Sequence, residues 1–332
     1  AGTNLLAIQG LNSASTSSDF LLLPEVVGLA PAVSSTPVYF SAPTPNAQNG
    51  AGSAGPLLAD ALPEDPDVPR PLGTEASPPL TVTVRVIKTK YAVSAVRAFS
   101  RVLYNAESAA VPMLDNGVAP DAAANDGIYS ARLQTTNVLA GQMFRWRFEA
   151  QDVSNTVTRL PAYADPLDSA QYFGTVAADP TAASSRLPVL EWFVQGSPTN
   201  GPTAAVFRGS CYCLSNFYDN VGHEIHGQST SGFGKKSYDF DFTDDDRFLW
   251  KDGERRVKDL NLLSNWADKT KTRNTFSHWV GKQTGTPYHY AFPVRVHLNG
   301  VFHGLLDMLE NGGDRMLERN GLDPDGALYK IY

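Results

Sequence analysis

The sequence of residues 226–242 is HGQSTSGFGKKSYDFDF, and it joins two patterns of different kinds. Its first part, 227–234, combines glycine with hydroxyl side chains, and two lysines follow it directly. Its last part alternates aromatic and acidic residues, which is the period of a half-buried β-strand. Glycines let backbone N–H groups approach phosphate oxygens, and a lysine on the next strand can pair with phosphate charge. The stretch therefore predicts either a phosphate-binding loop or a mobile surface hairpin, followed by a strand.

The same alternation predicts which of the two lysines faces inward. On a regular strand, Lys236 shares a face with the aromatic residues at 238, 240 and 242, whereas Lys235 shares a face with Asp239 and Asp241. We expect the aromatic face to cover an interior or a cleft, so Lys236 is the better candidate to meet a ligand and Lys235 is expected to be solvated. One bulge in the loop would reverse this assignment.

Strands and one helix are predicted on both sides of this stretch. Short apolar segments predict strands at 189–194, 204–207, 224–226, 292–298 and 302–309. The last two are joined by Asn299-Gly300, a strong hairpin signal. Thr270–Gln283 has helical character and ends at Gly285. Residues 187–332 are therefore predicted to form an α+β domain.

Residues 80–176 predict a domain of another kind. The segment LTVTVRVIK, Leu80–Lys88, alternates over its whole length and predicts a half-buried strand. Further strand candidates follow at 98–104, 127–133, 142–150 and 156–159. Evenly spaced strands over about 100 residues are typical of an all-β sandwich of the immunoglobulin or fibronectin type.

Three aspartates lie in one loop of this predicted sandwich. Asp115, Asp121 and Asp126 belong to the segment LDNGVAPDAAANDGIYSARL. Such a spacing is compatible with a calcium loop, but Asp-Gly and Asn-Gly pairs also form turns without a metal. Both interpretations stay open from the sequence.

Two stretches are predicted to be linkers. Residues 31–79 carry 11 of the 23 prolines, and proline lacks the N–H that regular pairing needs. A shorter Pro/Ser/Thr stretch covers 177–186. Before them, apolar segments predict strands within 1–30, as the closing part of a preceding β-domain. Because the chain starts with neither Met nor a signal peptide, we expect an internal piece of a longer protein.

The overall composition excludes several classes of protein. The 332 residues carry a net charge of −7, which argues against binding to nucleic acid. No apolar run reaches the ~18 residues of a membrane span. All six histidines lie after residue 222. Because catalysis uses titratable groups, any active site is expected in this second part.

Several candidate metal-binding patterns occur in the second part. Cys211 and Cys213 supply too few ligands for a zinc site and are predicted to be ordinary strand thiols. The segment HEIH, 223–226, has its histidines three residues apart, whereas a zinc-protease helix needs four. An acidic group suits either Mg²⁺ or a solvated strand end, and it consists of Asp239, Asp241, Asp244, Asp245 and Asp246.

Taken in order, these pieces resemble the CotH kinase family, the atypical protein kinases named for a spore-coat protein. The stretches that carry the resemblance are HGQSTSGFGKKSYDFDF (226–242), LNLLSNWADKTKTRN (260–274), VRVHLNGVFHGLLDMLEN (294–311) and ALYK (327–330). The front also resembles segments of large secreted bacterial proteins. Residues 1–30 look like the end of a galactose-binding-like domain, and 80–176 look like the immunoglobulin-like domain that precedes such kinases.

The resemblance implies an ATP- and Mg²⁺-dependent phosphotransferase. Its phosphate loop would use Gly227, Ser229 and Thr230, and either Lys235 or Lys236 would be the strand lysine. Leu309 and Glu310 would lie near the hinge beside the adenine pocket, and Arg273 takes the position of the helix arginine. His226 departs from the family, since many relatives carry arginine there.

The resemblance also implies that the kinase-like domain is incomplete. The metal-binding and catalytic aspartates are expected in a later Trp-Asp-x-Asp segment, which this chain does not contain, so its catalytic residues are unknown. The expected parent is an extracellular or cell-surface kinase that phosphorylates Ser or Thr of surface or coat proteins. The alternative is a non-enzymatic surface scaffold or adhesin that uses the same fold as a binding face.

Overall fold

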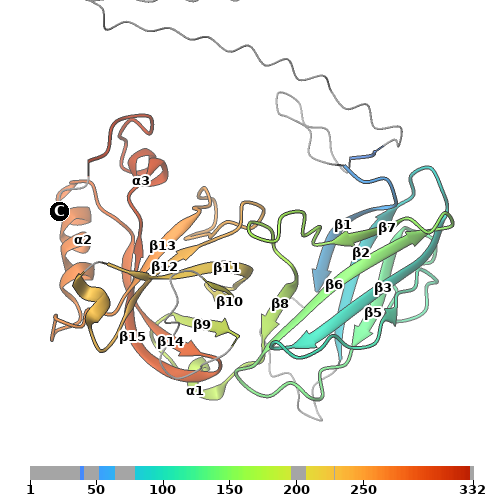
Figure 1. The fold of residues 1–332 in the computed structure, drawn as a ribbon, viewed down its shortest axis with the longest axis horizontal. Helices are drawn as coiled ribbons and strands as arrows, with labels where there is room; N and C mark the ends of the chain where they lie inside the picture. Colours follow the sequence, from blue (N-terminus) through green and yellow to red (C-terminus); the bar gives the residue numbers. More distant parts are fainter. Residues whose placement is uncertain (1–37, 41–51, 64–78, 196–206, 228, 330–332) are drawn as a thin grey trace, which may run out of the picture. The chain divides into compact units, whose positions relative to one another are not determined.

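The computed structural model describes residues 38–40, 52–63, 79–195, 207–227 and 229–329 (Figure 1). All of them belong to one unit of the chain, Val38–Tyr332. The strands predicted within 1–30, most of the linker 31–79 and part of the strand at 204–207 lie outside the described residues. None of the described helices is long and apolar enough to cross a membrane.

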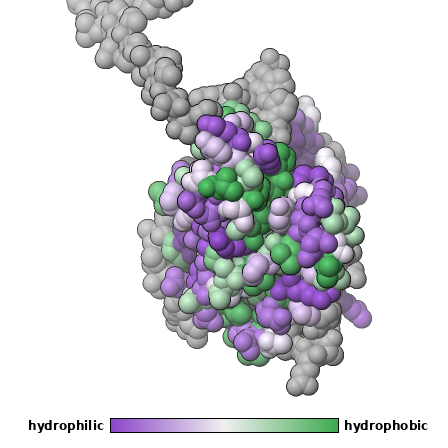
Figure 2. Space-filling view, turned by 90° about the vertical axis from the view of Figure 1, so that its right-hand side faces the viewer, coloured by the Kyte–Doolittle hydropathy of each residue, from purple (hydrophilic) through white to green (hydrophobic). Residues whose placement is uncertain are grey.

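The first part of the described chain consists of two antiparallel sheets. One has the order β1 (Leu57–Pro63), β2 (Leu80–Ile87) and β5 (Ile128–Leu133). The other contains β4 (Val111–Pro112), β3 (Val93–Val102), β6 (Met143–Asp152) and β7 (Val157–Leu160), with β8 (Phe173–Val176) paired to β6. Figure 2 shows hydrophilic and hydrophobic residues interspersed over one face of the molecule, on the right-hand side of Figure 1.

The two sheets share one hydrophobic core. Val82 and Val84 of β2 are fully buried, as the alternation predicts, and they belong to the same cluster as Trp146 and Phe148 of β6. The predicted strands of this region are confirmed, each to within a few residues at its ends. The immunoglobulin or fibronectin type of this arrangement stays a prediction.

Both stretches expected to be linkers contain regular structure. Residues 57–63, inside the proline-rich stretch, form β1 and pair with β2. A strand is possible there because β1 is an edge strand of its sheet and Pro63 is its last residue. The second stretch contains the short helix α1 (Pro180–Ala183), whose N-terminal amide at Thr181 donates to Asp179. The two stretches predicted to be linkers therefore contain one strand and one short helix.

The second part of the described chain is a closed barrel of seven strands. Its strands are β9 (Val189–Val194), β10 (Phe207–Cys213), β11 (Asn216–His226), β12 (Ser237–Asp241), β13 (Asp259–Leu263), β14 (Ala291–Leu298) and β15 (Val301–Glu310). They close in the order β10-β11-β12-β13-β15-β14-β9. All neighbours are antiparallel except β9 and β14, which run parallel. The barrel interior is filled by side chains such as Trp192, Tyr238 and Phe240.

The helices α2 (Arg273–Thr284) and α3 (Asp314–Arg319) are short additions to this barrel (Figure 1). The expected α+β domain is therefore mostly β in the described residues, because the predicted strands close on themselves. The predicted helix is confirmed, and Gly285 ends it with a positive φ of 74°. The predicted hairpin is also confirmed, since Asn299 and Gly300 both have positive φ, as a type I′ turn requires.

A buried carboxylate joins the barrel to the preceding sheets. Asp219 of β11 accepts hydrogen bonds from Ser210 Oγ of β10 at 2.6 Å and from Arg145 Nη1 of β6 at 3.1 Å. Its other oxygen accepts from the backbone N–H groups of Gln171 and Tyr172, at 3.1 and 2.9 Å. The side chains of Arg145 and Asp219 are only 4% and 2% exposed. Both parts of the chain therefore supply donors to one buried charge.

Removing this carboxylate is expected to destabilise the protein strongly. The substitution Asp219→Ala would leave the Arg145 guanidinium buried and unpaired, which costs about 3–5 kcal/mol. Urea unfolding of the wild type and the variant measures this loss. The exposed Asp252→Asn is the matched control and should change stability by less than about 0.5 kcal/mol. A loss below about 1 kcal/mol for Asp219→Ala would show that the pair does not hold the two parts together.

Candidate functional site

The outer face of the barrel carries a polar cavity of about 380 Å³. It forms because β11, β12 and β13 alternate, with aromatic and aliphatic residues turned into the barrel and polar residues turned outward. Its lining residues are Arg208, Gly222, His223, Glu224, His226, Asp239, Phe240, Asp241, Asp259, Leu260, Asn261 and Asn311.

The charges of this cavity are mainly negative. Four carboxylates line it, those of Glu224, Asp239, Asp241 and Asp259, against one guanidinium, that of Arg208. Burial raises the pKa of Asp241. Since carboxylate and amide oxygens are the ligands of hard divalent cations, the lining suits a metal ion or a ligand that carries one.

Several of these side chains hold one another in place. His226 Nδ1 lies 2.7 Å from Asp239 Oδ1, so a residue at the end of β11 is paired across to β12. The Nδ2 group of Asn311, directly after β15, donates to Asp259 Oδ2 at 2.6 Å. These pairs bring the ends of three strands to one cavity.

A second cavity of about 290 Å³ also has His226 in its lining. It is bordered by Phe233 of the glycine-rich loop, by Trp266 after β13, and by Arg273 and Asn274 at the start of α2. Trp266 is 51% exposed, and a Cβ built on Gly234 would lie 3.3 Å from its ring. The predicted loop thus lies between His226 and an exposed aromatic ring.

The glycine-rich loop closes on itself. Gly227 has a φ of +88°, a conformation that favours glycine, and a 3₁₀ turn follows at Ser229–Gly232. The Lys236 ammonium donates to the Ser231 carbonyl of the same loop. Lys236 therefore contacts the loop backbone, and its side chain does not enter the barrel.

Lys235 is the lysine that the structure places inward. Its Nζ donates to the Leu305 carbonyl of β15 at 3.0 Å, and a Cβ on Gly304 would lie within 2.3 Å of this atom. Burial, together with the nearby charge of Lys271, lowers the pKa of Lys235. The expected order of the two lysines was wrong because β12 begins only at Ser237, so the strand alternation does not extend back to them.

The two predicted hinge residues lie at the end of β15. The buried Glu310 pairs with Arg319, and its carboxylate accepts from the Tyr290 N–H at 3.0 Å. It borders a separate cavity of about 230 Å³, whereas its neighbour Asn311 borders the large polar cavity. The structure thus groups Gly227, Lys235 and Lys236 at one end of the barrel and places Leu309 and Glu310 further along β15.

The comparison with family models found a match for the last third of the chain. Residues 224–332 match the family model described as CotH kinase protein. This segment is similar to the CotH kinase family. The match begins inside β11 and therefore includes β12, β13, α2, β14, β15 and α3, while β9, β10 and most of β11 precede it. No curated protein matches the chain.

Some residues of the polar cavity were missed by the sequence analysis. Arg208 belongs to no motif, and Glu224, Asn261 and Asn311 lie in three separate quoted stretches in which they were not singled out. Asp239 and Asp241 were singled out as part of an acidic group with 244–246. The structure divides that group, because Asp244 pairs with Lys258 and Arg247 away from the cavity of the CotH segment.

The other predicted metal patterns have structural explanations. His223 lies inside the barrel and His226 outside, since they are three residues apart on a strand. Cys211 and Cys213 are both free and buried, as expected of strand thiols. Burial raises the pKa of Cys213 to about 12, so it remains a thiol at neutral pH.

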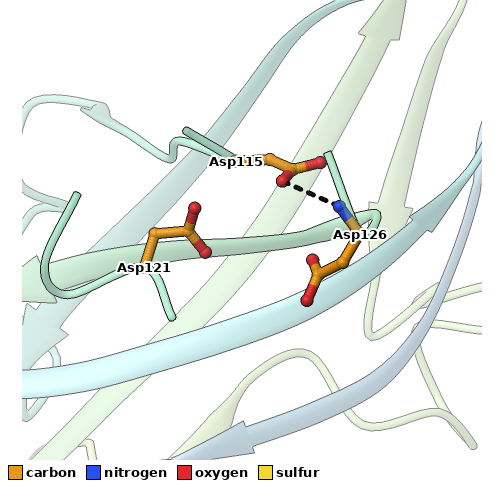
Figure 3. Close-up of side chains that lie close together, drawn as sticks. All are labelled: Asp115, Asp121 and Asp126. Carbon is orange, nitrogen blue, oxygen red and sulfur yellow. Dashed lines mark hydrogen bonds between the residues drawn. The ribbon is translucent and has the colours of Figure 1, made fainter. Parts of the chain in front are cut away.

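The three aspartates of the first part do lie together (Figure 3). Asp115, Asp121 and Asp126 bring ligand atoms within 4.8 Å of one another. Each carboxylate also accepts backbone N–H groups, for example Asp121 from Asn116 and Asp115 from Gly127. Within the described residues this is the only such group of three, and its hydrogen bonds alone explain the turn.

The buried His223 gives the stability of the protein a predictable pH dependence. Its ring is 1% exposed and accepts a hydrogen bond from Trp192 Nε1 at 3.2 Å. Burial, reinforced by Arg208, lowers its pKa to about 3, so folding favours the neutral ring. This contribution is present above the unfolded pKa of about 6.5 and is lost as pH falls from there towards 3.

Between pH 7 and pH 5 the wild type should therefore lose about 2 kcal/mol more stability than His223→Gln. Urea unfolding at both pH values measures the two losses, and their difference cancels the groups that both proteins share. Equal losses would contradict a neutral, buried His223.

Proposed function

We propose that the barrel is the nucleotide-binding lobe of a CotH-type kinase and that its outer polar cavity binds Mg·ATP. The observation that carries this proposal is the position of the cavity, between His226, which directly precedes the glycine-rich loop, and Asn311, which directly follows β15, largely within the CotH segment. Its volume of about 380 Å³ lies in the range of small-molecule and cofactor sites.

The lining residues fit a nucleotide that carries a divalent cation. Free polyphosphate would be repelled by the four carboxylates, whereas Mg²⁺ accepts them as oxygen ligands. When bound, Mg²⁺ neutralises the negative charge of the phosphates. Arg208 can pair with a phosphate oxygen, because guanidinium groups match phosphate geometry.

The remaining residues of the chain would bind and orient the ligand. The turn that Gly227 opens offers backbone N–H groups, and the Lys236 contact with Ser231 holds this turn. His226 keeps the Asp239 carboxylate oriented. The ring of Trp266 offers an exposed surface for a base beside the loop.

We extend the proposal to the protein to which this segment belongs. It would transfer phosphate to Ser or Thr of surface or coat proteins, outside the cell or at its surface. A non-enzymatic scaffold or adhesin remains the alternative, and it differs by requiring no nucleotide. Nucleotide binding is therefore the property to test first.

Binding of Mg·ATP is measured by calorimetry and by thermal unfolding. At 100 times its Kd the ligand should stabilise the chain by about 2.7 kcal/mol, a shift of roughly 5–11 °C. Arg208→Gln should weaken binding about tenfold, since it removes the cationic side chain from the cavity. Asp241→Asn should reduce the dependence of binding on Mg²⁺.

Two exposed substitutions, Arg132→Gln and Asp252→Asn, are the matched controls and should leave the Kd unchanged. The double variant Lys235→Ala/Lys236→Ala tests the loop separately. If that variant loses binding while the two cavity variants keep it, the nucleotide lies at the barrel end and the cavity assignment is wrong. Absence of binding to the wild type would remove the claim that this chain binds ATP.

A further inference from the structure

A different cavity lies beside the short helix α1 and the outer face of β9. Its volume is about 360 Å³. Its wall is largely apolar and includes Ala177, Ala182, Val189 and Leu214. Within the part of the chain that the structure describes, it shares no lining residue with the polar cavity of the CotH segment.

One acidic side chain faces this apolar space from β9. Leu190 and Trp192 turn into the barrel core, so Glu191 between them turns outward, into the cavity. Glu191 is only 5% exposed. Its Oε2 atom is buried and has no hydrogen-bond partner among the described residues. A buried carboxylate oxygen without a donor is costly, so this atom is ready to accept one from a ligand.

The other oxygen of Glu191 already has a polar neighbour. His297 Nδ1 lies 3.1 Å from Glu191 Oε1. Arg295 Nε donates to Nε2 of the same ring at 2.9 Å, so the proton of the neutral ring is on Nδ1. The arrangement places His297 of β14 beside Oε1 and leaves Oε2 as the carboxylate oxygen without a donor among the described residues.

The charges around the cavity select the sign of the ligand. Asp179, at the start of α1, is a second acidic residue of the lining, and among the described residues no lysine, arginine or histidine lines the cavity. An anion would be repelled, and a wholly apolar molecule would leave Oε2 without a donor. An ammonium group on an apolar body satisfies both features.

We propose that this cavity binds a small organic cation, a primary amine on a compact apolar body, whose ammonium donates to Glu191 Oε2. The site is separate from the proposed nucleotide cavity, since its residues belong to α1, β9 and the adjoining parts of β8 and β10. The apolar body lies against Ala182, Val189 and Leu214.

The site is tested with 2-phenylethylamine, and 2-phenylethanol is the neutral probe of the same shape. Calorimetry should show the amine binding at least tenfold more tightly than the alcohol. Glu191→Gln should abolish this difference, because the amide retains the shape but not the charge. Ala182→Leu should weaken both probes by filling the cavity, and Asp252→Asn should change neither.

The pH dependence gives a second readout. Burial, with the nearby charge of Asp179, raises the pKa of Glu191 to about 7. Affinity for the amine should therefore rise about tenfold from pH 6 to pH 8, as the carboxylate ionises, while the affinity for the alcohol should not. The charged and titratable groups near Glu191 are Asp179, Arg295, His297, Tyr212 and Cys213.

The pKa shifts of Asp179, His297 and Tyr212 all point away from the range between pH 6 and pH 8. Hydrogen bonds from Thr181 outweigh burial and lower the pKa of Asp179, and burial lowers that of His297. Burial raises the pKa of Tyr212 to about 12. A wild type that binds neither probe, equal affinities for both, or an unchanged amine affinity in Glu191→Gln would each overturn the proposal. Unfolding midpoints verify that the variants are folded.

Discussion

The carboxylate of Asp219 is the constraint on which the arrangement of the described chain depends. It lies in the barrel, yet three of its four donors come from residues that precede the barrel: Arg145 and the N–H groups of Gln171 and Tyr172. A buried charge is stable only if its lone pairs are satisfied, so these donors must stay where they are. Because Gln171 and Tyr172 directly precede β8, the same contact sets the course of the chain towards α1 and the cavity beside Glu191.

Local sequence patterns predicted most of the strands and the helix α2, but they did not predict that the strands close into a barrel. The alternation in Leu80–Lys88, the Asn299-Gly300 turn and the helix end at Gly285 are signals within a few residues, and each is confirmed. The pairing of β9 with β14 is parallel and joins residues about a hundred positions apart. Parallel strands are not joined by a short turn, so no local sequence signal predicts this pairing. The sequence therefore predicted neither the barrel nor strand β1 within the proline-rich stretch, and both were found only in the structure.

In the candidate site, too, local sequence predicted some residues, whereas others depend on how the strands pair. The glycine-rich loop and the two lysines were found from sequence, but their roles depended on where β12 begins. An irregular segment at 233–236 reverses the alternation, so Lys235 turns inward and Lys236 binds Ser231. The carboxylates of the polar cavity come from three strands, and only their lateral pairing brings them together. Glu191 carries no sequence signal at all, because its neighbours are ordinary residues of a strand.

The parallel contact between β9 and β14 also determines where this protein can be divided. The family match starts at residue 224, but the barrel needs strands that come earlier, from Val189 onward. A fragment cut at the family boundary would lose the partners of β12 and β14 and would expose two unpaired strand edges. Such edges recruit strands from other molecules. The evolutionary unit recognised in the sequence is thus smaller than the unit that can fold, and a soluble fragment must start before β9.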